Sequence, residues 1–201
     1  MVVHLLSACF CLGSSAMFHT FMIHSKTANT LLSRLDYGGI SILIMGSSYP
    51  GIFYGFACHQ VYTTRNWFLA LITTTSTCCF LSTMHPAMNT GPLRSVRGFM
   101  FIILGLSAGI PLFYMSKADK RYISFEGASQ WELGGAIYII GALIYVFRIP
   151  ERWQPKKFDL AFSSHNIFHL FVVSACIIHV NEALNMYHDR REKICPIDLP
   201  V

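Results

Sequence analysis

The chain has 201 residues, of which 53% are hydrophobic and 12% are charged, whereas about 25% of the residues of an ordinary soluble domain are charged. With a mean hydropathy of +0.47 and an aromatic content of 14%, this composition excludes a soluble single domain and a disordered chain, and it indicates a membrane protein. The net charge of +5 comes from lysines and arginines that occur singly or in pairs, so nucleic acid is not expected as a partner.

Six apolar windows are long enough to cross a bilayer as helices, because about 20 residues at a rise of 1.5 Å span a hydrocarbon core of roughly 30 Å. In chain order they are residues 2–23, 38–58, 67–85, 99–115, 131–147 and 160–181. They are continuous apolar runs and not alternating segments, so the sequence predicts an all-α, polytopic transmembrane helical bundle. No repeat or second domain interrupts them, and residues 1–201 are expected to form a single transmembrane domain.

The first window is interpreted as a true span and not as a signal peptide, because no lysine or arginine precedes Lys26 and the apolar run is too long. Loop charges predict the orientation, since cytosolic loops are enriched in lysine and arginine. If the loop after residues 2–23 is cytosolic, the loops on that side hold eight basic residues, against four in the loops on the other side. Three basic residues in the C-terminal tail reduce this difference. We therefore expect both termini to face away from the cytosol.

The seven cysteines form no CxxC pair, and most of them lie within apolar windows, where they behave as small hydrophobic residues. They are Cys9, Cys11, Cys58, Cys78, Cys79, Cys176 and Cys195. The sequence therefore predicts neither a disulfide framework nor a zinc site built from cysteines.

Four ionisable residues lie at membrane depth near one end of the windows, where such groups are costly and typically functional. His19 lies near the end of the first window, Asp36 at the start of the second, and His165 and His169 near the start of the sixth. The first window ends, and the second and sixth begin, on the same side of the membrane, so all four residues should lie in one leaflet.

His165 and His169 are four residues apart and so share one face of a helix. With His19 they would provide three imidazoles, and three protein ligands with an open fourth position are typical of a catalytic zinc site. Asp36 would hold or deprotonate the water of such a site, and Ser15, one turn before His19, would support it or touch a substrate carbonyl. The alternative is structural, because a single histidine in a membrane is most often an interhelical hydrogen-bond donor.

The other ionisable residues considered are interpreted as solvated or too distant. His179 lies ten residues after His169, about 15 Å further along the helix, and cannot join the same site. Glu132 and Glu182 are expected at the opposite interface, exposed to solvent. Solvated histidines at window ends or in loops are expected at His24, His59, His85 and His188.

The segments that carry these residues resemble the progestin and adipoQ receptor family, which is related to haemolysin III, and most closely the adiponectin receptors. The matching stretches are Ser15 to His19 with His24-Ser25, and Leu35-Asp36-Tyr37-Gly38-Gly39-Ile40 followed by Leu43 to Ser47. The most specific stretch runs from Arg148-Ile149-Pro150-Glu151-Arg152 through Phe158-Asp159 to Ser164-His165 and Phe168-His169. The spacing between the stretches also agrees, so the resemblance covers nearly the whole chain.

The resemblance implies a helical bundle with an intramembrane Zn²⁺ near the cytosolic face, held by His19, His165 and His169, with Asp36 reaching the metal through water. The resemblance to the adiponectin receptors implies a hormone receptor that also hydrolyses ceramide and signals to lipid and energy metabolism. The implied partners are a ceramide-like lipid or fatty acid in the bundle and an adiponectin-like extracellular protein, and the implied location is the plasma membrane.

The chain departs from the family pattern at two places. The family has seven spans and this chain has windows for six, so the resemblance implies that a first span and an amino-terminal domain are missing, as in a fragment, a short isoform or an incomplete gene prediction. Lys156 stands where the family usually has glycine, and we expect strain there if the turn requires a positive φ.

Three functional hypotheses follow. The first is an adiponectin-receptor-like zinc protein with lipid amide hydrolase activity, carried out by Asp36 and Ser15 beside the three histidines. The second is a signalling receptor with a purely structural zinc, or an inactive truncated fragment. A transporter or channel is the third, and it has little support because no other window carries paired charges.

Overall fold

The computed structural model describes residues 1–89, 91–124, 127–158, 161–192 and 195, and within these ranges the regular structure is entirely helical. This confirms the predicted all-α fold class. The long helices are α1 (Val2–Phe21), α2 (Lys26–Gly55), α3 (Tyr62–Met84), α4 (Arg94–Ser107), α5 (Gly109–Lys117), α6 (Ala128–Phe147) and α7 (Ser164–Glu192). Three short 3-10 helices lie in the loops, at His59–Val61, Pro86–Asn89 and Gly91–Leu93.

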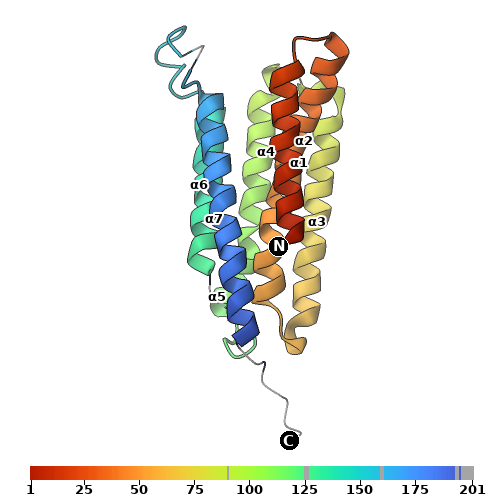
Figure 1. Ribbon diagram of the computed structural model, residues 1–201, viewed down its shortest axis with the longest axis vertical. Helices are drawn as coiled ribbons and strands as arrows, with labels where there is room; N and C mark the ends of the chain where they lie inside the picture. Colours follow the sequence, from red (N-terminus) through yellow and green to blue (C-terminus); the bar gives the residue numbers. More distant parts are fainter. Residues whose placement is uncertain (90, 125–126, 159–160, 193–194, 196–201) are drawn as a thin grey trace, which may run out of the picture.

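The helices run side by side along the long axis of the molecule, and α1, α2 and α3 lie together on one side in Figure 1. Five segments among the described residues are long and apolar enough to cross a membrane: α1, residues 59–84, residues 94–117, α6 and α7. α2, which has 30 residues and is about 45 Å long, is not among these segments. It falls outside that group by composition, because glycines, serines and tyrosines lower the mean hydropathy of its charge-free part, residues 38–55.

Helix boundaries differ from the apolar windows where polar residues belong to a helix. The side chain of Ser25 accepts a hydrogen bond from the backbone N–H of Ala28, so α2 begins at Lys26 and not at residue 38. α3 likewise begins at Tyr62, before the window that starts at residue 67. α7 begins at Ser164 and continues to Glu192, 11 residues beyond the window that ends at residue 181.

The window 99–115 corresponds to two helices, α4 and α5, which are separated at Ala108. Pro111 has no N–H for the carbonyl of Ser107, four residues before it, so a regular helical hydrogen bond is absent at this point. The proline therefore accounts for the interruption.

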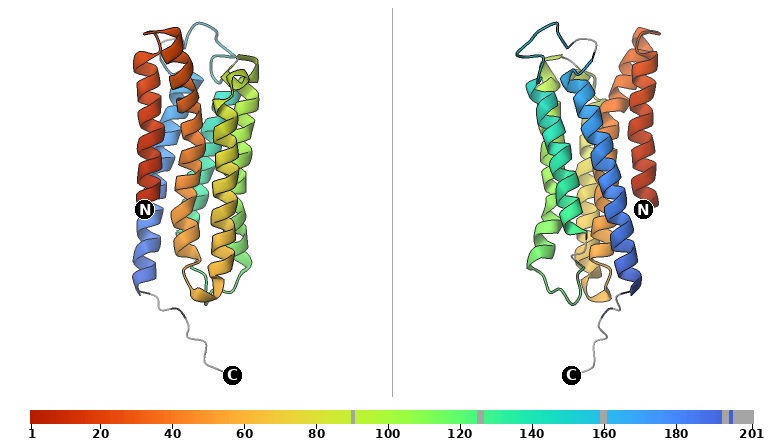
Figure 2. Two further views of the ribbon diagram at one scale, coloured as in Figure 1. Left: turned by 90° about the vertical axis from the view of Figure 1, so that its right-hand side faces the viewer. Right: turned by 60° about the vertical axis from the view of Figure 1, so that its left-hand side comes forward.

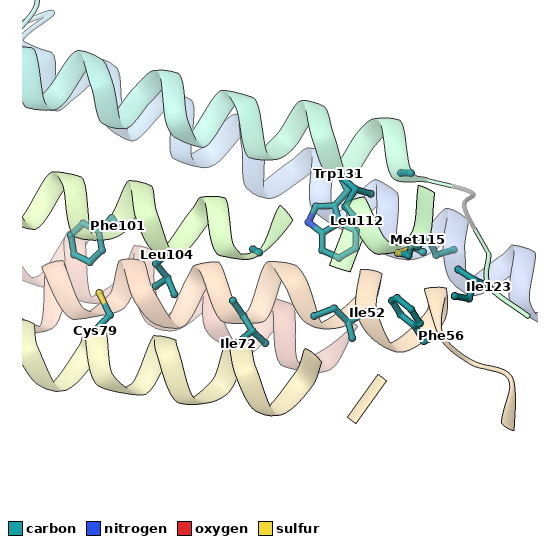
Figure 3. Close-up of a cluster of buried hydrophobic side chains, with 13 residues drawn as sticks. Ile52, Phe56, Ile72, Cys79, Phe101, Leu104, Leu112, Met115, Ile123 and Trp131 are labelled. Atoms are coloured by element: carbon teal, nitrogen blue, oxygen red, sulfur yellow. The ribbon is translucent and has the colours of Figure 1, made fainter. Parts of the chain in front are cut away.

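Two apolar cores hold the bundle together. The larger packs side chains of α2 to α7, including Ile52, Phe101 and Trp131, as Figure 3 shows. The smaller joins α1, α2 and α7 and contains Leu43 and Val172. Large apolar side chains also cover the outside of the bundle, which is the distribution expected for a protein surrounded by lipid.

α1 and α2 approach closely because small residues face each other. A Cβ atom added at Gly46 would lie only 1.8 Å from the Ser7 hydroxyl oxygen, so no larger residue fits there without movement. Contacts of this kind are typical of helix pairs in membranes. Figure 2 shows α1 and α2 running side by side in both views.

One end of the bundle is closed by a disulfide between Cys58, just after α2, and Cys195, whose Cα atoms are 5.6 Å apart. The expectation that the cysteines form no disulfide was therefore wrong for this pair. The two residues are 137 positions apart, so no local spacing could reveal them. Arg190 of α7 reinforces the same end by donating hydrogen bonds to the carbonyls of Tyr54, Gly55 and Tyr122. We call this the disulfide end.

Candidate metal centre

Three histidines from two helices converge at the opposite end of the bundle, which we call the triad end. His19 comes from the last turn of α1, and His165 and His169 from the first two turns of α7. The Nε2 atom of His165 lies 3.1 Å from that of His19 and 3.1 Å from that of His169. Among the described residues, this is the group of three potential metal ligands whose ligating atoms all lie within 4.8 Å of one another.

These positions fit a zinc ion. Zinc–nitrogen bonds of about 2.0–2.1 Å in a tetrahedral arrangement place two ligand nitrogens about 3.3 Å apart, close to the 3.1 Å seen here. The donor set is also that of three-histidine catalytic zinc sites, which leave one position for water or substrate. The triad therefore has the chemistry and spacing to hold Zn²⁺.

Asp36 and Ser15 lie beside the triad. Asp36 is 6% exposed and Ser15 7%, and the two side chains are close enough to interact. Asp36 is also close enough to His19 and His169 to interact with them electrostatically. The structure thus brings together all five residues singled out in the sequence, and their chemical roles remain predictions.

A polar network that sequence reasoning missed fixes the first turn of α7. The Arg94 guanidinium donates hydrogen bonds to the Tyr145 carbonyl at 2.9 Å and to the Ser164 hydroxyl at 3.3 Å. Ser164, directly before His165, donates to a carboxylate oxygen of Glu151 at 2.8 Å. Only Glu151 and Ser164 carried a signal, because both lie in the segment that resembles the receptor family, whereas the long-range partner Arg94 had none.

A cavity of about 310 Å³ lies inside the bundle, lined mostly by apolar side chains of α2 and α4 to α7. At the triad end its wall includes Tyr37, Arg97 and Tyr145, and the Tyr145 ring lies 5.7 Å from that of His165. Arg97 is buried, packs its guanidinium over the Tyr37 ring at 4.3 Å and donates to the carbonyl of Met88. An apolar interior of this kind suits a lipid chain.

A second buried polar cluster, which was not predicted, lies further along α7. Glu182 was expected to be solvated, but its side chain is fully buried and its Oε2 atom lies 2.7 Å from Nδ1 of His179. His4 of α1 is fully buried nearby, with its ring 6.3 Å from that of His179. The histidine partner makes burial of the Glu182 carboxyl tolerable. As expected, His179 is not part of the triad.

The remaining histidines agree with the sequence analysis. Exposed positions are occupied by His24, His59, His85 and His188. Glu132 is also exposed, and its side chain lies at the edge of the cavity.

Comparison with known proteins places the geometry in a family context. Residues 1–180 match the family described as haemolysin-III related. The chain is 39% identical over 176 residues to "Adiponectin receptor protein" of Drosophila melanogaster, covering 87% of this chain and 39% of that protein. It is 36% identical over 179 residues to "Heptahelical transmembrane protein 3" of Arabidopsis thaliana, with 89% and 52% covered.

A third relative is "Progestin and adipoQ receptor-like protein 1" of Caenorhabditis elegans, which is 33% identical over 192 residues, covering 94% of this chain and 44% of the nematode protein. The chain thus spans about half or less of the length of these three relatives.

Proposed function

Because this chain belongs to the haemolysin-III-related family of multi-pass membrane proteins, which includes adiponectin and progestin receptor relatives, we propose that it is a zinc-containing receptor with lipid amide hydrolase activity. The observation that carries the proposal is the convergence of His19, His165 and His169 beside the buried carboxyl of Asp36. A zinc ion held there supplies Lewis acidity for water activation and carbonyl polarisation.

The protein groups have separable roles in this reaction. Asp36 accepts a proton from the attacking water, and the hydroxyl of Ser15 holds the carboxyl in place. Water oxygen forms a bond to the amide carbon, the carbon–nitrogen bond breaks, and the proton passes to the leaving amine. The products are a fatty acid and an amine such as a sphingoid base.

The cavity supports a lipid substrate. Its triad end adjoins the histidines through Tyr145 and Phe168, and its interior is apolar. A ceramide-like lipid with its amide at the triad and an acyl chain in the cavity satisfies both features. The name of the Drosophila relative, an adiponectin receptor, supports an adiponectin-like protein as the ligand. A role in lipid and energy metabolism and a location in the plasma membrane belong to the same proposal and follow from the family resemblance.

Metal content is the first test. Purified wild-type protein should contain about one zinc per chain by plasma emission spectrometry, and the His165→Ala, His169→Ala double variant should contain none. His188→Ala, which changes an exposed histidine of the same helix, is the matched control and should keep its zinc. Zinc occupancy should fall below roughly pH 6, because only neutral imidazole ligates the metal. A folded wild-type protein without zinc would contradict the proposal.

Asp36→Asn separates a hydrolase from a receptor whose zinc is only structural. In the hydrolase, this variant keeps zinc and loses turnover of a ceramide substrate by about 100-fold or more, since a general base typically contributes 10²–10⁴-fold. If zinc is structural, wild-type protein shows no turnover, and Asp36→Asn alters zinc content or folding instead.

A further inference from the structure

The cavity has a second polar end, formed by residues that the proposed hydrolysis does not use. His179 and Tyr138 line it, and the Tyr138 ring stacks on the His179 ring with centroids 5.6 Å apart and an interplanar angle of 15°. The Ser47 hydroxyl lies 3.4 Å from the Tyr138 hydroxyl and also lines the cavity. Three helices, α2, α6 and α7, therefore each contribute one hydrogen-bonding side chain at this point.

Glu182 orients His179 from behind. Its carboxylate accepts a hydrogen bond from Nδ1 of His179, and the pair is almost completely buried, with 2% and 0% exposure of the two side chains. A carboxylate partner holds the proton on Nδ1 and leaves Nε2 for another partner. Nε2 makes no hydrogen bond to a described residue, and the ring packs directly against Gly134, where an added Cβ would lie 2.6 Å from Nε2.

The second carboxylate oxygen of Glu182, Oε1, is buried and has no hydrogen-bond partner among the described residues. A buried polar atom of this kind is rare and typical of a functional site. Ten residues separate His179 from His169 in α7, which places His179 about 15 Å from the triad along the helix axis.

The two ends differ in charge. At the triad end the cavity wall contains Arg97, whereas at the other end it contains Glu132 and, behind His179, Glu182. A carboxylate would be attracted to the arginine and repelled from the glutamates. A neutral hydroxyl suits the second end, because it can both donate to and accept from His179, Tyr138 and Ser47.

We propose that Ser47, Tyr138 and His179 form a binding site for the hydroxyl group of a neutral lipid whose apolar part occupies the cavity. Glu182 is a positioning residue, which acts through His179. The inference rests on lipid occupancy of the cavity, as in the proposed function, but it requires neither zinc nor hydrolysis. Linear alcohols and sterols share this chemistry, and the experiment distinguishes them.

The test measures equilibrium binding to the full chain, purified in detergent, of four radiolabelled probes: 1-tetradecanol, its methyl ether, tetradecanoate and cholesterol. We expect wild-type protein to bind one of the two alcohols, and to prefer tetradecanol over its ether by roughly three- to tenfold if the linear alcohol fits, the value of one hydrogen bond. Tighter binding of cholesterol would assign the site to a sterol. For that outcome cholesteryl methyl ether replaces the linear ether.

Four variants test which residues cause the preference for the alcohol over its methyl ether. His179→Phe and Tyr138→Phe keep the stacked ring shapes and should lose this preference, and Glu182→Gln should reduce it. His188→Phe, an exposed position on the same helix, should leave it unchanged. If His179→Phe does not fold, Tyr138→Phe still tests the site, because it removes only one oxygen atom.

Equal binding of alcohol and ether by the wild type would overturn the inference, as would a preference that survives in both His179→Phe and Tyr138→Phe. Zinc is measured on the same samples. A protein that lacks zinc but keeps the alcohol preference would contradict the proposed hydrolase and support the hydroxyl site, whereas zinc without the preference would do the reverse.

Discussion

Lys156, in the loop between α6 and α7, has a φ of 72°, in the left-handed region that favours glycine. The strain expected there from the sequence is thus confirmed. A left-handed backbone costs a residue with a side chain roughly 1–2 kcal/mol. Glycine avoids this cost but loses more conformational entropy on folding, so replacement by glycine recovers only part of it.

Lys156→Gly should therefore stabilise the protein by up to about 1 kcal/mol, measured as a rise in thermal unfolding temperature in detergent. Lys157→Gly is the matched control, because Lys157 is not among the residues with a positive φ, and this change should leave the protein unchanged or slightly less stable. A lower unfolding temperature for Lys156→Gly than for Lys157→Gly would show that the lysine side chain makes a contact worth more than the strain.

Glu151, in the same loop, should make the stability of the protein depend on pH. Partial burial acts to raise its pKa, but hydrogen bonds from its own backbone N–H and from Ser164, together with the charge of Arg94, hold the pKa of Glu151 below its ordinary value of 4.5. A carboxyl with a lowered pKa in the folded state stabilises the protein above its unfolded pKa, and this contribution is lost as the pH falls through the folded pKa.

Ser164→Ala should accordingly destabilise the protein by about 1 kcal/mol at pH 7, and by less near pH 4, as measured by thermal unfolding at both values. Ser163→Ala provides the comparison, because the Ser163 hydroxyl accepts from the backbone N–H of Asn166 and makes no ionisable contact. Its effect should be independent of pH. A pH-independent loss for Ser164→Ala would contradict the proposed contribution of Glu151.

At the scale of the helices, the contact between α1 and α2 depends on Gly46. Gly46→Ala would place a methyl group against Ser7 and near the carbonyl of Val3, and forced repacking of this kind typically costs about 1–3 kcal/mol. Gly13→Ala is the control, since nothing lies within 4 Å of its added Cβ. We expect Gly46→Ala to lower the unfolding temperature and Gly13→Ala to leave it unchanged or raise it. Equal effects would mean that α1 moves away at no cost.

Sequence patterns predicted the helix boundaries well where the helix coincides with an apolar window, and less well where polar residues extend the helix. Hydropathy located α1 and α6 within a few residues. It missed the start of α2, which depends on the Ser25 cap, and the end of α7, which lies 11 residues beyond the apolar window. In both places the helix includes polar residues that mean hydropathy excludes.

The candidate site followed the same division. His165 and His169 share a helix face by spacing alone, and the alternating direction of the spans placed His19 and Asp36 at the same end. The contact of Arg94 with Ser164 joins side chains that are far apart in sequence. A single sequence contains no signal for such contacts.

For the whole molecule, the disulfide supports the orientation expected from loop charges. Structural disulfides persist in extracellular and lumenal compartments. Cys58 follows the C-terminal end of α2 and Cys195 follows α7, whereas His165 and His169 of the triad lie at the start of α7, at the opposite end of the bundle. The triad end would then face the cytosol, and the hydroxyl site the outer half of the bundle.

Sealed microsomes, whose outside is cytosolic, test this orientation. A membrane-impermeant maleimide should label a Lys26→Cys variant directly, because that exposed residue begins α2 at the triad end, directly after the loop that follows α1. Cys58 and Cys195 should react only after detergent and reductant are added together. Labelling of these two cysteines by impermeant reductant and maleimide in sealed vesicles would reverse the orientation.

The Cys58–Cys195 bond also bears on how the protein is made. Between the two cysteines the chain crosses the bundle four times, through α3, α4 with α5, α6 and α7. In synthesis from the amino terminus, Cys195 emerges after all of these crossings. If any one of them failed to insert, Cys195 would be left in the compartment opposite Cys58, and the bond could not close. The fraction of chains with the Cys58–Cys195 bond therefore reports how many molecules have inserted these four crossings so that both cysteines lie on the same side of the membrane.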